Sequence, residues 1–249
     1  PHGGTDKLRA MVQGLSRRIA ELGGSVRYDA HVVDLDIKNN AVQGVILDGG
    51  ERLAAGAVVL ACGHSARDTY AMLARRGVGI VAKPFAIGVR IEHPQALIDS
   101  IQYHCETRGE YLPAASYSLV SQENGRGVYS FCMCPGGYVV GAASETGSVV
   151  TNGMSEYARD GQNSNAALLV GITPEDFGSA HPLAGIAFQR KIERAAFEAG
   201  GGAYSAPCQR VGDLLENRVT TALNGSVQPT YRPGVVPGDL RAVLPDYIC

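Results

Sequence analysis

The sequence lacks an excess of charge of either sign. Lysine and arginine number 22 against 24 aspartates and glutamates, so the net charge is -2. A nearly neutral chain does not provide the basic surface that binding to a phosphate backbone requires, and we therefore expect no nucleic-acid partner. Charged residues make up only 18% of the 249 residues and apolar residues 45%, which excludes a disordered chain and a coiled coil.

The sequence also lacks a long apolar run, a signal peptide and a regular cysteine framework. The longest apolar stretch, residues 54–62, falls far short of the roughly 20 residues that a transmembrane helix needs, so no membrane partner is expected. The first five residues have neither the charged nor the apolar segment of a signal peptide. The six cysteines contain no C-x-x-C pair, which favours reduced thiols in a cytoplasmic protein. The missing initiator methionine and the end at Cys249 suggest that both ends are cut.

The first 79 residues alternate between helical and strand patterns. Apolar residues at helical spacing predict a helix from Thr5 or Asp6, either of which fits an N-cap, to Leu22. Strand-like runs follow at residues 25–28, 31–37, 41–47 and 57–62, and Asn39-Asn40 predicts a hairpin turn. The last run is unbroken and apolar, as expected for a strand buried on both faces, and a helix over residues 66–76 comes directly after it. This order predicts the second half of a nucleotide-binding α/β domain without its first half.

From about residue 80 the pattern becomes rich in strands. Helices are predicted from Pro94 to about Gln102 and from Pro182 to Gly200, and Pro135-Gly136-Gly137 predicts a hairpin turn. Strand-like runs lie at residues 85–91, 117–121, 128–133, 138–142 and 166–172, and short helical runs at 211–215 and 239–244. We therefore predict an α/β plus β-rich α+β chain. Residues 1–79 would form a partial nucleotide-binding domain, a helix plus a β-meander, and residues 80–249 a second domain.

Two short motifs resemble known signatures but lack the required context. Residues 77–82 match the letters G-x-G-x-x-A, yet a helix precedes them, whereas a dinucleotide fingerprint needs a preceding strand and a following helix. Residues 63–67 resemble the nucleophile elbow G-x-S-x-G, but Arg67 stands where the tight turn needs a small residue. Ser65 fits a helix N-cap better, and that helix N-terminus could also face a phosphate. A serine hydrolase with Ser65 as nucleophile is therefore the third alternative.

A set of polar residues in the second part is the best candidate for chemistry. Cys132 and Cys134 stand two apart in a predicted strand, so both thiols should share one face, either as core packing or as an active-site pair. Arg90 interrupts an apolar strand and, if it faces inward, needs an anion from the protein or from a ligand. Residues 151–155 predict a polar loop of the kind in which pockets collect polar groups. The remaining histidines and cysteines have no recognised metal-binding spacing, so no metal site is expected.

Several long, ungapped stretches resemble one bacterial family, the uncharacterised FAD-dependent dehydrogenases, and together they cover nearly the whole chain. They are Pro1-His2-x-Gly4-Thr5-Asp6-Lys7-Leu8, Val58 to Thr69 with Gly63-His64-Ser65-Ala66-Arg67-Asp68, Lys83 to Pro94, Tyr129 to Gly137 with Cys132-Met133-Cys134-Pro135-Gly136-Gly137, Val150 to Ser155, and Ala206 to Asp213. The resemblance implies a two-part flavoprotein of the glutathione-reductase-like type. In such proteins, Gly-rich segments near both ends hold the FAD, and a substrate domain is inserted between them.

Both Gly-rich FAD segments are missing from this sequence. The resemblance therefore implies a central fragment whose partners include the missing N- and C-terminal parts of the same protein. The first domain would be a partial FAD/NAD(P)-binding domain, and the second an inserted substrate or cap domain. By resemblance, Val32 or Val33 would lie near the adenine, and the turn Ala61, Cys62 and Gly63 would lie beside the nucleotide.

We interpret the chain as a fragment of an FAD-dependent oxidoreductase, a dehydrogenase, that carries the substrate-side domain for a small-molecule substrate. The alternative is a non-catalytic module that binds a ligand or a protein. The candidates for lining the substrate side are Cys132, Cys134, Arg90, Lys83, Asn152 and Gln209. Without a Gly-rich segment, the fragment should retain FAD weakly or not at all. The strand at residues 58–62 would expose an unpaired edge, through which a homodimer could form.

Overall fold

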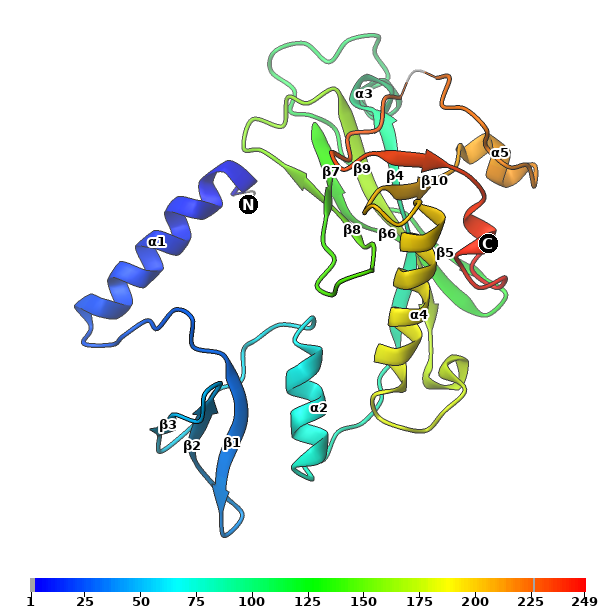
Figure 1. Ribbon diagram of the computed structural model, residues 1–249. Coiled ribbons are helices and arrows are strands. Elements are labelled where there is room, and N and C mark those ends of the chain that lie inside the picture. The colour runs from blue at the N-terminus through cyan, green and yellow to red at the C-terminus, as the bar shows by residue number, and fades with distance from the viewer. Residues whose placement is uncertain (1–2, 226) are drawn as a thin grey trace.

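The computed structural model describes residues 3–225 and 227–249 (Figure 1). Pro1 and His2, which open the first stretch of the family resemblance, lie outside the described residues. Within these residues the chain forms five α-helices, two short 3₁₀-helices and eleven strands in four separate sheets. Three of the sheets are antiparallel, and the pair β10 and β11 is parallel. The mixed α/β fold class predicted from the sequence is confirmed.

The N-terminal part consists of one helix, an antiparallel meander and a second helix. The elements are α1 (Thr5–Glu21), β1 (Val32–Lys38), β2 (Ala41–Leu47), β3 (Arg52–Ala54) and α2 (Arg67–Arg75). Asn39 and Asn40 have φ values of 50° and 60°, which is the left-handed geometry of a tight two-residue hairpin turn. Buried Leu35, Leu47 and Met72 form the small core of this part. Arg76, at the end of α2, is paired with Asp34 on β1.

Residues 85–249, called the body below, are built around a four-stranded antiparallel sheet in the order β4-β9-β6-β5. Its strands are β4 (Phe85–Pro94), β5 (Val120–Glu123), β6 (Arg126–Cys134) and β9 (Asn163–Ile172), and α3 (Gln95–Tyr103) continues directly from β4. β9 lies between β4 and β6, and for this reason its residues 163–166 are all buried.

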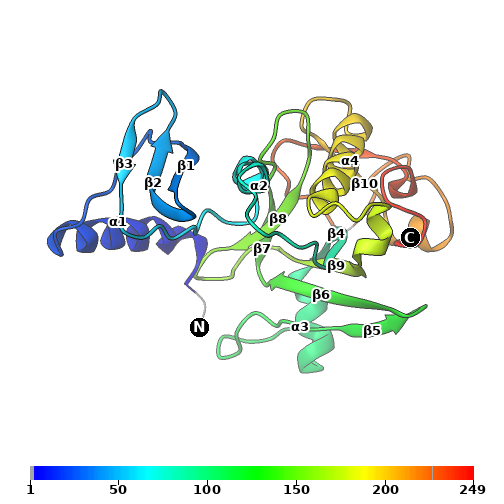
Figure 2. The same ribbon diagram turned by 90° about the horizontal axis from the view of Figure 1, so that it is seen from below.

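Eight further described elements complete the body, and the first two of them lie directly against the sheet (Figure 2). They are β7 (Gly137–Gly141), β8 (Thr151–Ser155), η1 (Pro174–Phe177), α4 (Ala184–Ala199), β10 (Ala206–Cys208), α5 (Val211–Leu215), β11 (Val235–Pro237) and η2 (Leu240–Ala242). A hydrophobic cluster of Val139, Val149, Ala206 and Tyr231 packs against α4 and joins β7 and the segment before β8 to the C-terminal segment. No described helix is both long enough and apolar enough to cross a lipid bilayer.

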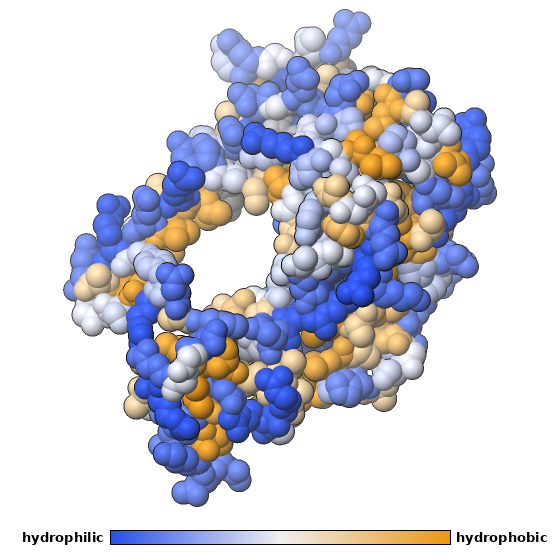
Figure 3. All heavy atoms as spheres, viewed as in Figure 1, coloured by the Kyte–Doolittle hydropathy of each residue, from blue (hydrophilic) through white to orange (hydrophobic). Residues whose placement is uncertain are grey.

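Among the described residues, the hydrogen bonds between helix α1 and the body come from the first residues of the helix. Thr5 Oγ1 donates to the carbonyl of Ser155 at 3.2 Å, and the N–H of Tyr157 donates to Asp6 Oδ1 at 2.9 Å. Gly4 occupies the N-cap position. The side chains of Thr5 and Asp6, which were predicted to cap the helix, bind the body instead and do not cap it. The rest of α1 stands away from the body, and Figure 3 shows an opening between α1, the meander and the body.

Four local predictions are wrong. Residues 57–62 form no strand, because no described segment pairs with them, and Val59 is 87% exposed. This segment consequently offers no sheet edge to a second chain. Residues 25–28 are also irregular, and residues 151–155 are not a loop, because they pair along their whole length with β7. Pro135-Gly136 is a turn but not a hairpin, because β6 and β7 belong to different sheets.

Candidate functional site

The strongest polar cluster of the body gathers around Arg90 on β4. Its Nη1 donates to Asn165 Oδ1 at 2.6 Å and to the carbonyl of Cys132 at 3.3 Å, and its Nη2 donates to Asn152 Oδ1 at 3.2 Å. Arg90 faces Ala167 in the β4–β9 register, so Asn165, two residues along β9, shares its face of the sheet. Four strands, β4, β6, β8 and β9, thus supply what we call the Arg90 cluster: Arg90, Cys132, Cys134, Asn152 and Asn165.

A glycine on β8 allows the backbone to pass directly against this guanidinium. A Cβ atom at Gly153 would lie 2.0 Å from Asn165 Oδ1 and 2.1 Å from Arg90 Nη1. Any side chain there would displace one of the two groups. Sequence reasoning placed this glycine in a loop and therefore missed its packing role.

The Arg90 cluster has a positive charge that no described carboxylate of the protein pairs with. Among the described residues, the ion pairs include neither Arg90 nor the neighbouring Arg159. Asn165 is fully buried, yet its Nδ2 donor has no acceptor, and the buried Nε of Arg159 has none either. A buried donor without an acceptor costs about 1–3 kcal/mol, so the cluster is short of acceptor oxygens.

The two cysteines of the cluster have different surroundings. Cys134 stands opposite Asn165, whereas Cys132 lies in a bulge where the register shifts and has a φ of 44°. The regular alternation that predicted a shared face is therefore broken. Cys132 is exposed; half-buried Cys134 donates its thiol to the carbonyl of Cys132 at 3.3 Å. Burial raises the pKa of the Cys134 thiol, against the opposing effect of the positive charge of Arg90. Both thiols are free, as predicted.

The structure does not bring Lys83 and Gln209 to this cluster. Lys83 is exposed in the segment before β4. Gln209 holds the C-terminal segment together, since its Nε2 donates to the carbonyl of Arg218 at 2.7 Å and its Oε1 accepts from the N–H of Leu240 at 2.9 Å.

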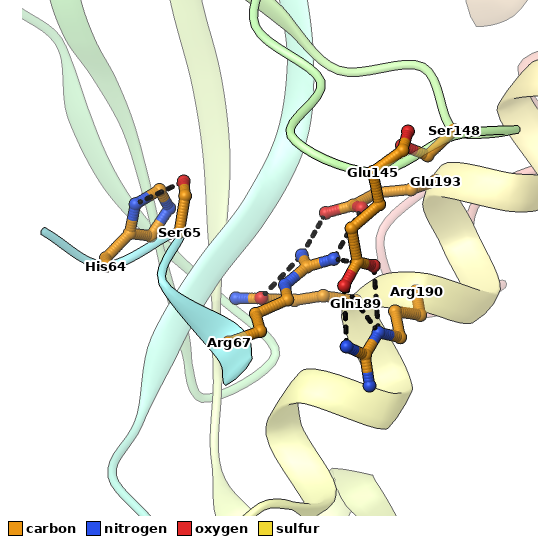
Figure 4. Close-up of polar contacts among 8 residues, drawn as sticks. All are labelled: His64, Ser65, Arg67, Glu145, Ser148, Gln189, Arg190 and Glu193. Carbon is orange, nitrogen blue, oxygen red and sulfur yellow. Dashed lines mark hydrogen bonds and ion pairs between the residues drawn. The ribbon is translucent and has the colours of Figure 1, made fainter. Parts of the chain in front are cut away.

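A second polar network, which sequence reasoning missed, joins α2 to the body (Figure 4). The buried guanidinium of Arg67 donates to Glu193 at 2.6 and 3.0 Å, to Glu145 at 2.7 Å and to Gln189 at 3.2 Å. Arg190 on α4 binds the same Glu145, and it is the larger cause, before Arg67, of lowering the pKa of that carboxyl to about 2. The arginine that argued against a nucleophile elbow thus connects two distant parts of the chain.

The turn before α2 does not form a hydrolase site in the described residues. Ser65 Oγ lies 3.1 Å from His64 Nδ1, and both side chains are exposed and point away from the Arg67 network (Figure 4). A catalytic triad needs a carboxylate to orient the histidine, and no hydrogen bond or ion pair joins a described carboxylate to His64. Ser65 is not the N-cap either, because Ala66 occupies that position and no side chain caps α2.

The residues assigned to FAD by resemblance lie at the start of β1 and in the segment before α2. His31 Nε2 lies 2.9 Å from Asp68 Oδ2, which brings the start of β1 beside the start of α2. Val33 sits at an irregularity in the β1–β2 register and is 36% exposed, while Val32 is half-buried. The turn at residues 61–63 is exposed, and its Gly63 has a φ of 79° with open space around it. The exposed backbone at these positions leaves room for the adenine end of FAD, whereas no described helix begins at the strand-to-helix G-x-G-x-x-G turn that would hold the pyrophosphate.

The described residues contain no group of three or more histidine, cysteine or acidic side chains that could hold a metal ion.

Comparison with known proteins identifies the family. The family described as "FAD-dependent protein, C-terminal domain-like" matches residues 84–249. A protein of Clostridium beijerinckii, itself described as uncharacterized, is 48% identical over 249 residues, which are 99% of this chain and 46% of that protein. The chain spans about half the length of the curated relative it matches. The chain belongs to the family of FAD-dependent proteins that share this C-terminal domain.

Proposed function

We propose that this chain is the substrate-side part of an FAD-dependent oxidoreductase and that its small-molecule substrate binds at the Arg90 cluster. The observation that carries this proposal is the guanidinium of Arg90, which is fixed by three neutral oxygen atoms beside two free thiols and has no described protein carboxylate as a partner. An arginine held in this way is oriented by the fold, while its charge remains available to a ligand.

In an FAD-dependent oxidoreductase, the cofactor and the protein residues would have different roles. Bound FAD would supply the electron-pair transfer, while this chain's residues would bind and orient the substrate. Arg90 and Asn165 would position it, and Cys134 would form part of the surrounding wall. Because the burial that raises the pKa of Cys134 keeps this thiol protonated, its proposed role is packing and hydrogen bonding rather than nucleophilic attack.

We further propose that the chain acts within a longer protein, whose other segments are its partners and hold most of the FAD. The matched relative is about twice as long. Helix α1 has no buried residue, and five of its apolar side chains and that of its C-cap are largely uncovered: Leu8, Met11, Val12, Leu15, Ile19 and Leu22 are 44–70% exposed. Another part of the whole protein would cover this face, because apolar stripes of this kind normally pack against a second element.

Purification of the whole protein tests the proposal. It should carry bound FAD with its visible absorbance, and under anaerobic conditions the substrate should reduce the flavin by two electrons and bleach that absorbance. The Arg90→Gln variant should keep the flavin but lose substrate turnover, whereas Arg18→Gln, on an exposed face of α1, should keep both. A whole protein without flavin would contradict the proposal and favour a non-catalytic binding module. Titration of the 249-residue chain with FAD should show weak or no binding, since the Gly-rich segments are absent.

A further inference from the structure

We infer that Arg90 is a carboxylate receptor: its free edge, formed by Nε–H and the second Nη2–H, binds a carboxylate group of the ligand. Calling that ligand the substrate rests on the proposed function; the binding of a carboxylate does not.

The inference begins with a count of hydrogen-bond donors. A guanidinium has five N–H donors. Arg90 uses both protons of Nη1, on Asn165 Oδ1 and on the carbonyl of Cys132, and one proton of Nη2, on Asn152 Oδ1. Two donors remain, on Nε and on Nη2. Within the described residues, Arg90 Nε makes no hydrogen bond to an oxygen atom and is not one of the fully buried donors without a partner, and the Cys134 thiol lies within hydrogen-bonding range of the same guanidinium. Two adjacent donors are the number that a bidentate carboxylate takes.

Two other arginines of this chain, Arg241 and Arg76, bind a carboxylate through the corresponding edge of their guanidinium groups. Arg241 donates through Nε to Asp239 Oδ1 at 2.8 Å and through Nη2 to Asp239 Oδ2 at 2.9 Å. Arg76 uses the same two atoms for the two oxygens of Asp34. In both cases the protein supplies the carboxylate. At Arg90 the fold supplies neutral oxygens to the opposite edge and leaves this one open.

The surroundings of Arg90 favour an anion over a neutral ligand. Two of the buried groups without a partner are donors, Asn165 Nδ2 and Arg159 Nε; the third, the Ser164 hydroxyl, belongs to the residue before Asn165 and so to the opposite face of β9. Burial raises the pKa of the Cys134 thiol, and the positive charges of Arg90 and Arg159 act in the opposite direction. A carboxylate would bring the acceptor oxygens and the negative charge that the Arg90 cluster lacks. A neutral amide would supply an acceptor oxygen but no negative charge.

The exposed thiol of Cys132 offers a reporter at the proposed site. The chain would be treated with iodoacetamide in the presence of acetate, benzoate or succinate, and in parallel with the neutral analogue benzamide. Alkylation would be followed by mass spectrometry on the peptide from Gly127 to Arg159, which trypsin releases intact. We expect at least a threefold slower alkylation of Cys132 at saturating carboxylate and no change with benzamide. The exposed Cys62, in the turn before α2, serves as an internal control that should react at the same rate throughout.

Variants assign the effect to Arg90. Arg90→Gln should abolish protection, and Arg90→Lys, which keeps the charge but loses the paired donors, should weaken it at least fivefold. Arg76→Lys, a matched control whose carboxylate partner is already present, should protect as the natural chain does. If Arg90→Gln does not fold, Arg90→Lys and the benzoate-against-benzamide comparison decide. Equal protection by benzamide, protection that persists in Arg90→Gln, or no protection by any of the three carboxylates would overturn the inference. The test needs no flavin, so its failure is distinct from the absence of FAD in the whole protein.

Discussion

Arg67 donates two hydrogen bonds to the carboxylate of Glu193, at 2.6 and 3.0 Å, across 126 residues of sequence. This pair joins α2, in the N-terminal part, to α4, in the part that the FAD-dependent family matches. The side chain of Arg67 is 7% exposed and that of Glu193 is 15% exposed. Little water therefore competes for the pair, and the orientation of α2 on the body depends on it.

Replacing Arg67 with methionine should destabilise the chain by about 3 kcal/mol, because it leaves the Glu193 carboxylate partly buried without its partner. Urea denaturation followed by circular dichroism would measure the loss. The matched control is Arg18→Met, since the Arg18–Glu21 pair on α1 is more than 60% exposed on both sides and should contribute little. Equal stability of the Arg67→Met variant and the natural chain would show that α2 is held by other contacts.

Stability should fall at acidic pH because of carboxylates whose pKa the fold lowers. Arg190 first, and then Arg67, lower the pKa of Glu145 to about 2, and Arg126 does the same for Asp176. In the unfolded chain these groups titrate near 4.5 and 3.8. Their contribution is therefore complete above about pH 5 and is lost as the pH falls towards 2. Melting temperatures between pH 7 and pH 3 should drop less steeply in Glu145→Gln than in the natural chain. An unchanged slope would contradict this assignment.

Local sequence signals predicted the local structure well. The pair Asn39-Asn40 located the β1–β2 hairpin, because asparagine tolerates the positive φ that such a turn needs. Helical spacing located α1, and the Pro and Gly signals at helix ends helped to locate α2, α3 and α4, all to within about two residues. The predicted strand at residues 57–62 does not form. An apolar run becomes a buried strand only when neighbouring strands pair with it, and no described segment pairs with this one.

The candidate site could be predicted only in part. Arg90 was identified because it is a lone charged residue in an apolar strand. The sequence left open whether a protein carboxylate or a ligand balances its charge. Asn165 was missed, because the predicted strand began one residue later and nothing in the sequence aligns it with β4. The Arg67 network was missed for the same reason, since its partners lie 78 and 126 residues away. Register and long-range pairing decide both sites, and a single sequence does not encode them in any local pattern.

The two thiols of the cluster should react at different rates. Iodoacetamide should modify Cys132 several-fold faster than Cys134 near pH 8, because Cys132 is exposed, whereas burial raises the pKa of Cys134 and lowers its thiolate fraction. Fragment ions that separate the two residues on either side of Met133 would measure each rate. In guanidinium chloride the two rates should become similar, which serves as the control. Faster reaction of Cys134 in the folded chain would contradict the described burial.

Replacing Gly153 with alanine should displace Arg90 and thereby disable the proposed carboxylate receptor. The new Cβ would lie 2.1 Å from Arg90 Nη1 and 2.0 Å from Asn165 Oδ1, so at least one of these buried contacts must break. We expect a loss of about 1–3 kcal/mol in stability and the loss of Cys132 protection by benzoate. Gly14→Ala is the matched control, because no atom lies within 4 Å of its Cβ and alanine favours the helix by about 1 kcal/mol. A Gly153→Ala variant that is as stable as the natural chain and still protected by benzoate would mean that Arg90 does not pack against β8.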